Sequence, residues 1–288
     1  MCNSLFDKDR MPIETVNMKD SIELKISDNI SLIHDVSVHC GKTTDMAKGL
    51  FLCCKGRLCA GESAGFGLPV WKTRHQTIFP TLFSANVISE TAIEKVFQMD
   101  RVLVWHIVGR KTPAWFSHLV ERLVEGFMKM PAIQHRLLKL RTIVMSCLDI
   151  RSSMEPGPDR GLCRVVYEAT PEGFIVKIDG RSIMGQGRLL MLNEVDGSTF
   201  DQLTTNDHSL QDLEIPAWKK VSFNTLLAST VLNVGFSLTP GVAEDCSSFH
   251  IFCGREVALG LNWAGLAITN PRHTFTYRVN IQTVKTDK

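Results

Sequence analysis

The chain has 288 residues, of which 44% are hydrophobic and 22% are charged, and its formal net charge is +2. These proportions are those of a folded soluble chain and argue against a disordered, collagen-like or membrane-spanning protein. So small a net charge also argues against nucleic acid as a partner, because nucleic-acid-binding domains gather a strong basic excess on one face.

The N-terminus and the cysteines report on the cellular compartment. The opening MCNSLFDKDRMPIE lacks the continuous apolar region of a secretion signal, and no later stretch holds about 18 uncharged apolar residues in a row. A cytoplasmic protein is therefore expected. Nine cysteines in a long chain without such a signal are expected to be reduced, mostly buried thiols.

Short runs rich in β-branched and aromatic residues recur along the chain and predict β-strands. In residues 21–26 and 275–281, apolar and polar side chains alternate, which indicates antiparallel strands with one buried face. Four dipeptides that end in glycine accompany such runs and predict tight hairpin turns. They are Lys55-Gly56, Glu172-Gly173, Asp179-Gly180 and Cys253-Gly254.

Residues 61–69, GESAGFGLP, begin with a G-x-S-x-G pattern that resembles the nucleophile elbow of α/β-hydrolases. An elbow requires a strand that turns sharply into a helix at the serine. Here Gly65, Gly67 and Pro69 occupy the positions where that helix would begin. We therefore expect Ser63 to lie in a glycine-rich bend or bulge at the edge of a sheet, and we assign no catalytic residue.

Residues 113–141 break the β pattern. Apolar residues recur there at the spacing of an amphipathic helix, with Thr112 as a plausible N-cap and Pro113 at the first helical position. Pro131 ends or kinks the helix, so the segment predicts one helix or a helical hairpin.

The same segment is basic. Residues 110–141 hold seven Lys and Arg against two Glu, a formal balance of +5. A basic amphipathic helix suits the surface of an anionic membrane, so a peripheral membrane contact is one interpretation. The alternative is that its apolar face packs on the sheet, as in most proteins that combine a helix with a sheet.

Acidic residues supply two further hypotheses. If Glu62 shares a pocket with Glu194 or Asp196, the two carboxyl groups can act as general acid and base in sugar chemistry. Residues 193–214 are acidic but do not fit the EF-hand pattern, so a solvated loop is expected. Neither a metal nor a cofactor is expected from the sequence.

The remaining candidates are tryptophans in or beside predicted strands, because an indole can stack on a sugar or another flat ligand. They are Trp71, Trp105, Trp218 and Trp263. Residues 260–268, GLNWAGLAI, surround Asn262 and Trp263 with small residues and predict a pocket wall. With the carboxylate beside the glycine-rich bend, the predicted ligand-binding residues are Glu62, Trp71, Asn262 and Trp263.

The predicted fold is mainly β: a large antiparallel β-sandwich or wide barrel with the helix or helical hairpin of residues 113–141 inserted. Residues 1–288 form a single β-rich domain, with two β halves on either side of this segment as the alternative. The first functional interpretation is binding of a small molecule, a sugar or an apolar compound, in a pocket of the β-structure. An enzyme of carbohydrate modification or hydrolysis and a membrane-associated interaction protein are the alternatives. The oligomeric state does not follow from the residues.

Overall fold

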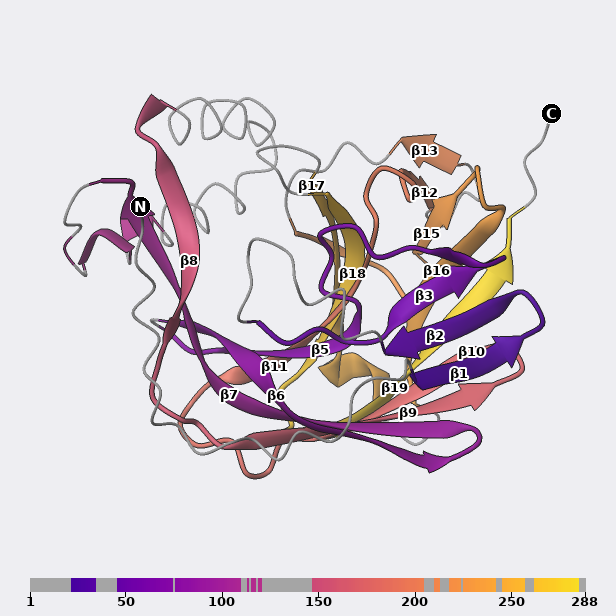
Figure 1. The fold of residues 1–288 in the computed structure, drawn as a ribbon, viewed down its shortest axis with the longest axis horizontal. Coiled ribbons are helices and arrows are strands. Elements are labelled where there is room, and N and C mark those ends of the chain that lie inside the picture. Colours follow the sequence, from indigo (N-terminus) through magenta and orange to yellow (C-terminus); the bar gives the residue numbers. More distant parts are fainter. Residues whose placement is uncertain are drawn as a thin grey trace, which may run out of the picture.

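The computed structural model describes residues 22–34, 46–74, 76–109, 113, 115–117, 119–120, 147–204, 210–212, 218–223, 225–241, 245–256 and 262–284. Nearly all of these residues lie in β-strands or in the turns between them (Figure 1). The strands in chain order are β1 (Ile22–Ser27), β2 (Ile30–His34), β3 (Phe51–Cys54), β4 (Arg57–Leu58), β5 (Phe66–Lys72), β6 (Thr77–Ser89), β7 (Ala92–Ile107), β8 (Ile150–Pro156), β9 (Leu162–Thr170), β10 (Gly173–Asp179), β11 (Arg188–Val195), β12 (Gln202–Thr204), β13 (Leu210–Asp212), β14 (Lys219–Val221), β15 (Leu226–Ser229), β16 (Val234–Pro240), β17 (His250–Glu256), β18 (Trp263–Asn270) and β19 (Thr274–Thr283). A short 3₁₀ helix, η2 (Cys246–Ser248), precedes β17.

One large sheet dominates the molecule. Its 15 strands follow the order β13-β12-β15-β16-β19-β10-β9-β7-β6-β5-β11-β18-β17-β14, with β8 paired to β7. Figure 1 shows this sheet curled on itself, and its neighbouring strands are antiparallel. A second sheet has the order β1-β2-β3-β4. The prediction of a mainly antiparallel sandwich or barrel is confirmed.

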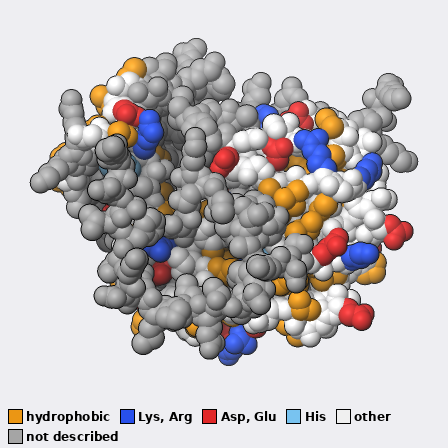
Figure 2. Space-filling view, in the orientation of Figure 1, with side chains coloured by type: hydrophobic (Ala, Val, Ile, Leu, Met, Phe, Trp, Pro, Cys, Tyr) orange, Lys and Arg blue, Asp and Glu red, His pale blue; other side chains and the backbone are white. Residues whose placement is uncertain are grey.

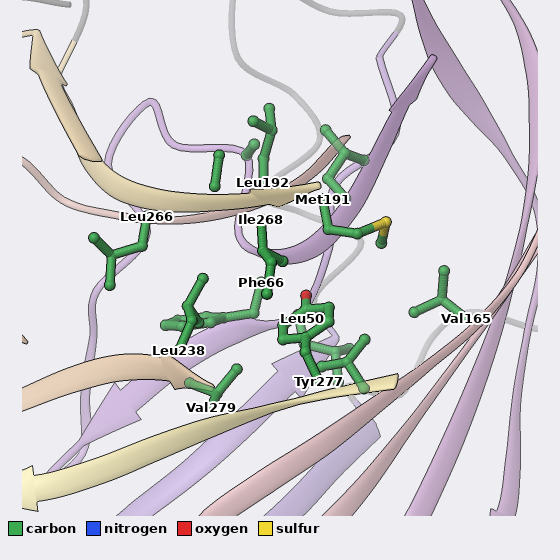
Figure 3. Packing of buried hydrophobic residues seen from close by; sticks show 14 of the residues in the cluster. Leu50, Phe66, Val165, Met191, Leu192, Leu238, Leu266, Ile268, Tyr277 and Val279 are labelled. Atoms are coloured by element: carbon green, nitrogen blue, oxygen red, sulfur yellow. The ribbon is translucent and has the colours of Figure 1, made fainter. Parts of the chain in front are cut away.

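The curled sheet encloses a continuous apolar core. Side chains from its inner face, among them Phe66, Met191, Leu238, Ile268 and Val279, point toward one another in Figure 3. All five are fully buried, so the alternation seen in the sequence places one face of each strand in this core.

A buried lysine joins the small sheet to the large one. Lys95 of β7 is fully buried, and its Nζ donates hydrogen bonds to the backbone oxygens of Lys48 and Gly49, the second at 3.1 Å. His34 of β2 lies within hydrogen-bond distance, with its Nδ1 3.2 Å from the same nitrogen. Three polar atoms therefore surround the Lys95 nitrogen, and burial lowers the pKa of this lysine to about 7. We call this arrangement the Lys95 latch.

The second half of β7 extends beyond β6 and β9. Residues 92–98 pair with β9, residues 101–107 pair with β8, and β6 pairs with β7 only as far as Val102, so residues 103–107 form a two-stranded ribbon with β8. Beyond the ribbon, residues 115–117 and 119–120 are helical, as the sequence predicts. The remainder of the predicted helical segment, apart from Pro113, lies outside the described residues.

Two of the four predicted hairpin turns are confirmed. Lys55-Gly56 joins β3 to β4, and a hairpin joins β9 to β10 at Pro171-Glu172, directly before Gly173 as the first residue of β10. The prediction for Cys253-Gly254 is wrong because both residues lie inside β17. Asp179-Gly180 follows β10, but β10 pairs with β9 and β19 and not with the next strand, so this turn does not close a hairpin.

In the large sheet, three strands from before residues 113–141, β7, β6 and β5, lie between two groups of strands from after this segment. β5 pairs with β11, and β7 pairs with β9. The number of domains stays a prediction. Among the described residues, no helix is both long enough and apolar enough to span a bilayer.

Candidate functional site

The G-x-S-x-G stretch does not form a nucleophile elbow. Ser63 is 1% exposed, and its hydroxyl donates to the backbone oxygen of Ala60 in the same turn. The chain continues directly into β5 and not into a helix. The serine therefore lacks both the accessibility and the local structure that a nucleophile of this type needs.

The glycine-rich stretch forms a bulge in the large sheet. Gly67 has a φ of +72°, and the pairing of β5 with β11 shifts register at this residue. A Cβ atom on Gly67 would lie 2.6 Å from Cε1 of Tyr167, so only glycine fits. The predicted bulge is confirmed, but its predicted place at a sheet edge is wrong because β5 lies between β6 and β11.

Three of the four predicted ligand-binding residues come together around this stretch. The backbone N–H of Glu62 donates to the backbone oxygen of Asn262 at 3.2 Å, and Trp263 follows as the first residue of β18. The Glu62 side chain is exposed, whereas those of Asn262 and Trp263 are half-buried. The sequence offered no reason for residues 62 and 262 to be adjacent.

Trp71 lies elsewhere. It is fully buried, with its ring edge-on to His273 at a centroid distance of 5.0 Å. Trp71 pairs with Leu189, which in turn pairs with Asn270 at the opposite end of β18 from Trp263. Along a strand, that separation corresponds to roughly 20 Å. The structure therefore does not bring Trp71 to the other three residues.

Trp218, a candidate tryptophan that the sequence analysis did not place in the site, stacks on Trp263. The ring centroids are 5.0 Å apart, and the ring planes are 22° from parallel. The two indoles approach from strands on either side of β17 and meet over Gly254, where a Cβ atom would lie 3.1 Å from Trp263 and 3.2 Å from Trp218. Both rings are half-buried. We call them the indole pair.

A buried carboxyl group lies next to the indole pair. Glu194 of β11 pairs with Gly265 of β18, which pairs with Gly254 of β17. A Cβ atom on Gly265 would lie 2.7 Å from Cγ of Glu194, so this glycine leaves the space that the carboxyl side chain fills. Two glycines on adjacent strands thus let Glu194 and the two indoles lie side by side on the sheet.

The environment of Glu194 favours its neutral form. Glu194 is 7% exposed, and burial raises its pKa to about 7, opposed by a 2.7 Å hydrogen bond from the Ala64 N–H and by Lys48. Burial also lowers the pKa of Lys48, against the attraction of Glu194 and Glu62. The Nζ of Lys48 donates to the backbone oxygen of Ser63 at 2.9 Å.

A polar turn completes the site. Asp196 accepts hydrogen bonds from the Asn262 amide at 2.7 Å and from the Ser198 hydroxyl at 2.7 Å. Burial raises the pKa of Asp196, but the hydrogen bonds from Thr199, Ser198 and Asn262 outweigh this effect and lower it. A Cβ atom on Gly61 would lie 3.2 Å from Cα of Asp196, which places the Glu62 turn against Asp196. Both predicted carboxyl partners of Glu62, Glu194 and Asp196, therefore lie around its turn.

The sequence analysis named Trp218 as a candidate without placing it in the site, and it missed Gly254 and Gly265. A glycine inside a strand pattern signals the close approach of another group, and this signal is present in the runs HIFCGREV and NWAGLAI. At Gly254 this signal was interpreted as a turn, because the dipeptide Cys253-Gly254 resembles the turn of a hairpin. Which tryptophan meets that glycine depends on strand pairing, which the sequence does not display.

The described residues contain no group of three or more His, Cys, Asp or Glu side chains placed to hold a metal ion. Their seven cysteines are all free thiols. Lys, Arg, Asp and Glu side chains are interspersed on the described part of the face in Figure 2.

Comparison with known proteins adds little. No family model and no curated protein matches the sequence. A structural match is an α-mannosidase from Enterococcus faecalis, with a TM-score of 0.37 and 10% sequence identity. The match covers 91% of this chain but only 29% of the mannosidase. A likeness this distant carries no argument about activity.

Proposed function

We propose that this protein binds a carbohydrate-like ligand, meaning a molecule with an apolar ring face and several hydroxyl groups, against the indole pair. The observation that carries the proposal is the position of two half-exposed stacked indoles beside the polar turn of Asp196, Ser198 and Asn262. The C–H face of a sugar packs on an indole ring, while its hydroxyls bond to carboxylate and amide groups.

A second function, chemical modification or hydrolysis of the same ligand, is favoured by Glu194. Its carboxyl group has a pKa raised to about 7 by burial, which suits a general acid at neutral pH. The exposed Glu62 supplies a second carboxyl group on the neighbouring turn. Release of p-nitrophenol from p-nitrophenyl glycosides tests this function, and the Glu194→Gln variant is expected to abolish it.

Binding is tested with a defined panel: glucose, galactose, mannose, N-acetylglucosamine and their disaccharides, each at about 10 mM, a concentration that detects Kd values near 1 mM. A ligand is expected to raise the melting temperature and to change tryptophan fluorescence. Trp263→Ala is expected to weaken binding at least about tenfold, because the stacking surface is lost.

The control is Val231→Ala, which removes a side chain that is 72% exposed in the turn between β15 and β16, outside the strands of the site. It is expected to bind as the wild type does. Absence of any response across the panel, or equal binding by Trp263→Ala, would refute the proposal.

A further inference from the structure

The far end of the β7–β8 ribbon has an apolar surface that carbohydrate binding does not use. Val108, Trp115, Leu119 and Leu148 are 41%, 63%, 45% and 52% exposed. We call these four residues the ribbon-tip surface. Figure 1 shows β8 leaving the curled sheet toward the upper left, and Figure 2 shows hydrophobic side chains exposed in that region.

The local structure directs these side chains outward. The N–H of Val108 donates to the backbone oxygen of Asp149 at 3.0 Å, so Val108 and Leu148 flank the same end of the ribbon. Trp115 and Leu119 are four residues apart in a helical segment and therefore lie on one face of it.

The other face of this segment attaches to the ribbon. Val120 is 8% exposed, and Phe116 is half-buried. The Ser117 hydroxyl accepts a hydrogen bond from the backbone N–H of Trp105 at 3.0 Å. The inward face thus packs on the β-structure, which is one of the two interpretations that the sequence allowed for this helix. Packing on the ribbon does not explain Trp115 and Leu119, because these two side chains form a second apolar face that is exposed.

The charge of the neighbouring sequence indicates what kind of surface the ribbon-tip surface binds. Residues 110–141, which begin two residues after β7, have a formal balance of +5, which leaves the rest of the chain at −3. A negatively charged surface would therefore attract this segment and repel the remainder of the chain. Exposed Trp and Leu beside basic residues are the composition of segments that lie in the interface of an anionic bilayer.

We propose that the ribbon-tip surface docks on anionic lipid membranes, with Trp115 and Leu119 entering the headgroup region and the basic flanking sequence supplying electrostatic attraction. An indole suits this depth because its ring is apolar and its N–H is polar. The contact is peripheral, and it directs the ribbon toward the lipid.

Co-sedimentation with vesicles tests this proposal. The full-length protein is mixed with vesicles of phosphatidylcholine alone or with vesicles in which about a third of the lipid is phosphatidylserine. Sedimentation is expected only with the anionic vesicles, and raising salt from about 0.1 M to about 1 M is expected to reduce it strongly. The double variant Trp115→Ala/Leu119→Ala is expected to lower the partition coefficient at least about tenfold.

The matched control is Val87→Ala/Ile88→Ala, which removes two side chains that are 57% and 56% exposed at the end of β6. It is expected to sediment as the wild type does, and far-UV circular dichroism verifies the fold of both variants. Wild-type protein that stays in the supernatant with anionic vesicles overturns the proposal. So does a dimer that the Trp115→Ala/Leu119→Ala variant dissociates without any binding to vesicles, because the ribbon-tip surface is then a contact between copies of the chain.

Discussion

At the scale of single residues, Glu194 makes stability depend on pH. Its folded-state pKa of about 7 lies above the ordinary value of 4.5 because the carboxyl group is buried. The stabilising effect of its neutral form is therefore complete below about pH 4.5 and is lost as pH rises through about 7. A shift of this size corresponds to roughly 3 kcal/mol.

Glu194→Gln is expected to remove this dependence, since glutamine keeps an acceptor for the Ala64 N–H without a charge. Urea unfolding at several pH values between about 4 and 8 measures the difference between variant and wild type. That difference should grow in favour of the variant as pH rises. The control is Glu172→Gln, which changes an exposed turn residue and should follow the wild type at every pH. If the free energy of unfolding of Glu194→Gln ran parallel to that of the wild type over this pH range, the expectation would be contradicted.

Residue-level reasoning found part of the candidate site. Glycine-rich patterning identified the bend at Glu62 and the small residues around Asn262 and Trp263, and these are adjacent in the structure. It failed for Trp71 because the local sequence around a tryptophan in a strand does not show whether the indole faces the core or a ligand. It named Trp218 as a candidate but did not place it beside Trp263, because the partner of an indole is set by cross-strand pairing between residues far apart in the chain.

At the scale of elements, the Lys95 latch holds the small sheet against β7. The Nζ of Lys95 donates hydrogen bonds to the backbone oxygens of Lys48 and Gly49, and both oxygens lose this donor when Lys95 is replaced by an apolar residue. Lys95→Met retains the aliphatic volume but leaves these acceptors without the donor. We expect it to lower the free energy of unfolding by about 2 kcal/mol.

Lys177→Met is the matched control because Lys177 also lies on a strand, β10, but forms an exposed ion pair with Glu168. Its effect should be under about 1 kcal/mol. Urea unfolding of the two variants measures both values. Equal stability of Lys95→Met and the wild type would show that the latch does not stabilise the docking of the two sheets.

Element types were more predictable than element partners. The alternation in residues 275–281 identified β19, and the dipeptides at residues 55 and 172 identified two hairpins, because period and turn chemistry are local properties. The glycine of Cys253-Gly254 signalled packing against the indoles and not a turn. Local sequence does not distinguish these two uses of glycine.

At the scale of the whole molecule, the pairing of β5 with β11 and of β7 with β9 connects residues from both sides of the helical segment. Residues 1–112 expressed alone are therefore expected not to fold, because β5 and β7 would lose their partners. Circular dichroism during heating measures this: the fragment should show no cooperative transition. A cooperative transition in the fragment would instead support two β halves that fold independently.

The position of β19 has a consequence for the synthesis of the protein. β19 is the last strand along the described chain, yet it lies between β10 and β16 inside the large sheet. While the ribosome is still adding these residues, β10 and β16 each lack their shared neighbour and present open edges. Such edges invite pairing with other chains, so we expect the protein to be most prone to aggregation before β19 has been synthesised and inserted.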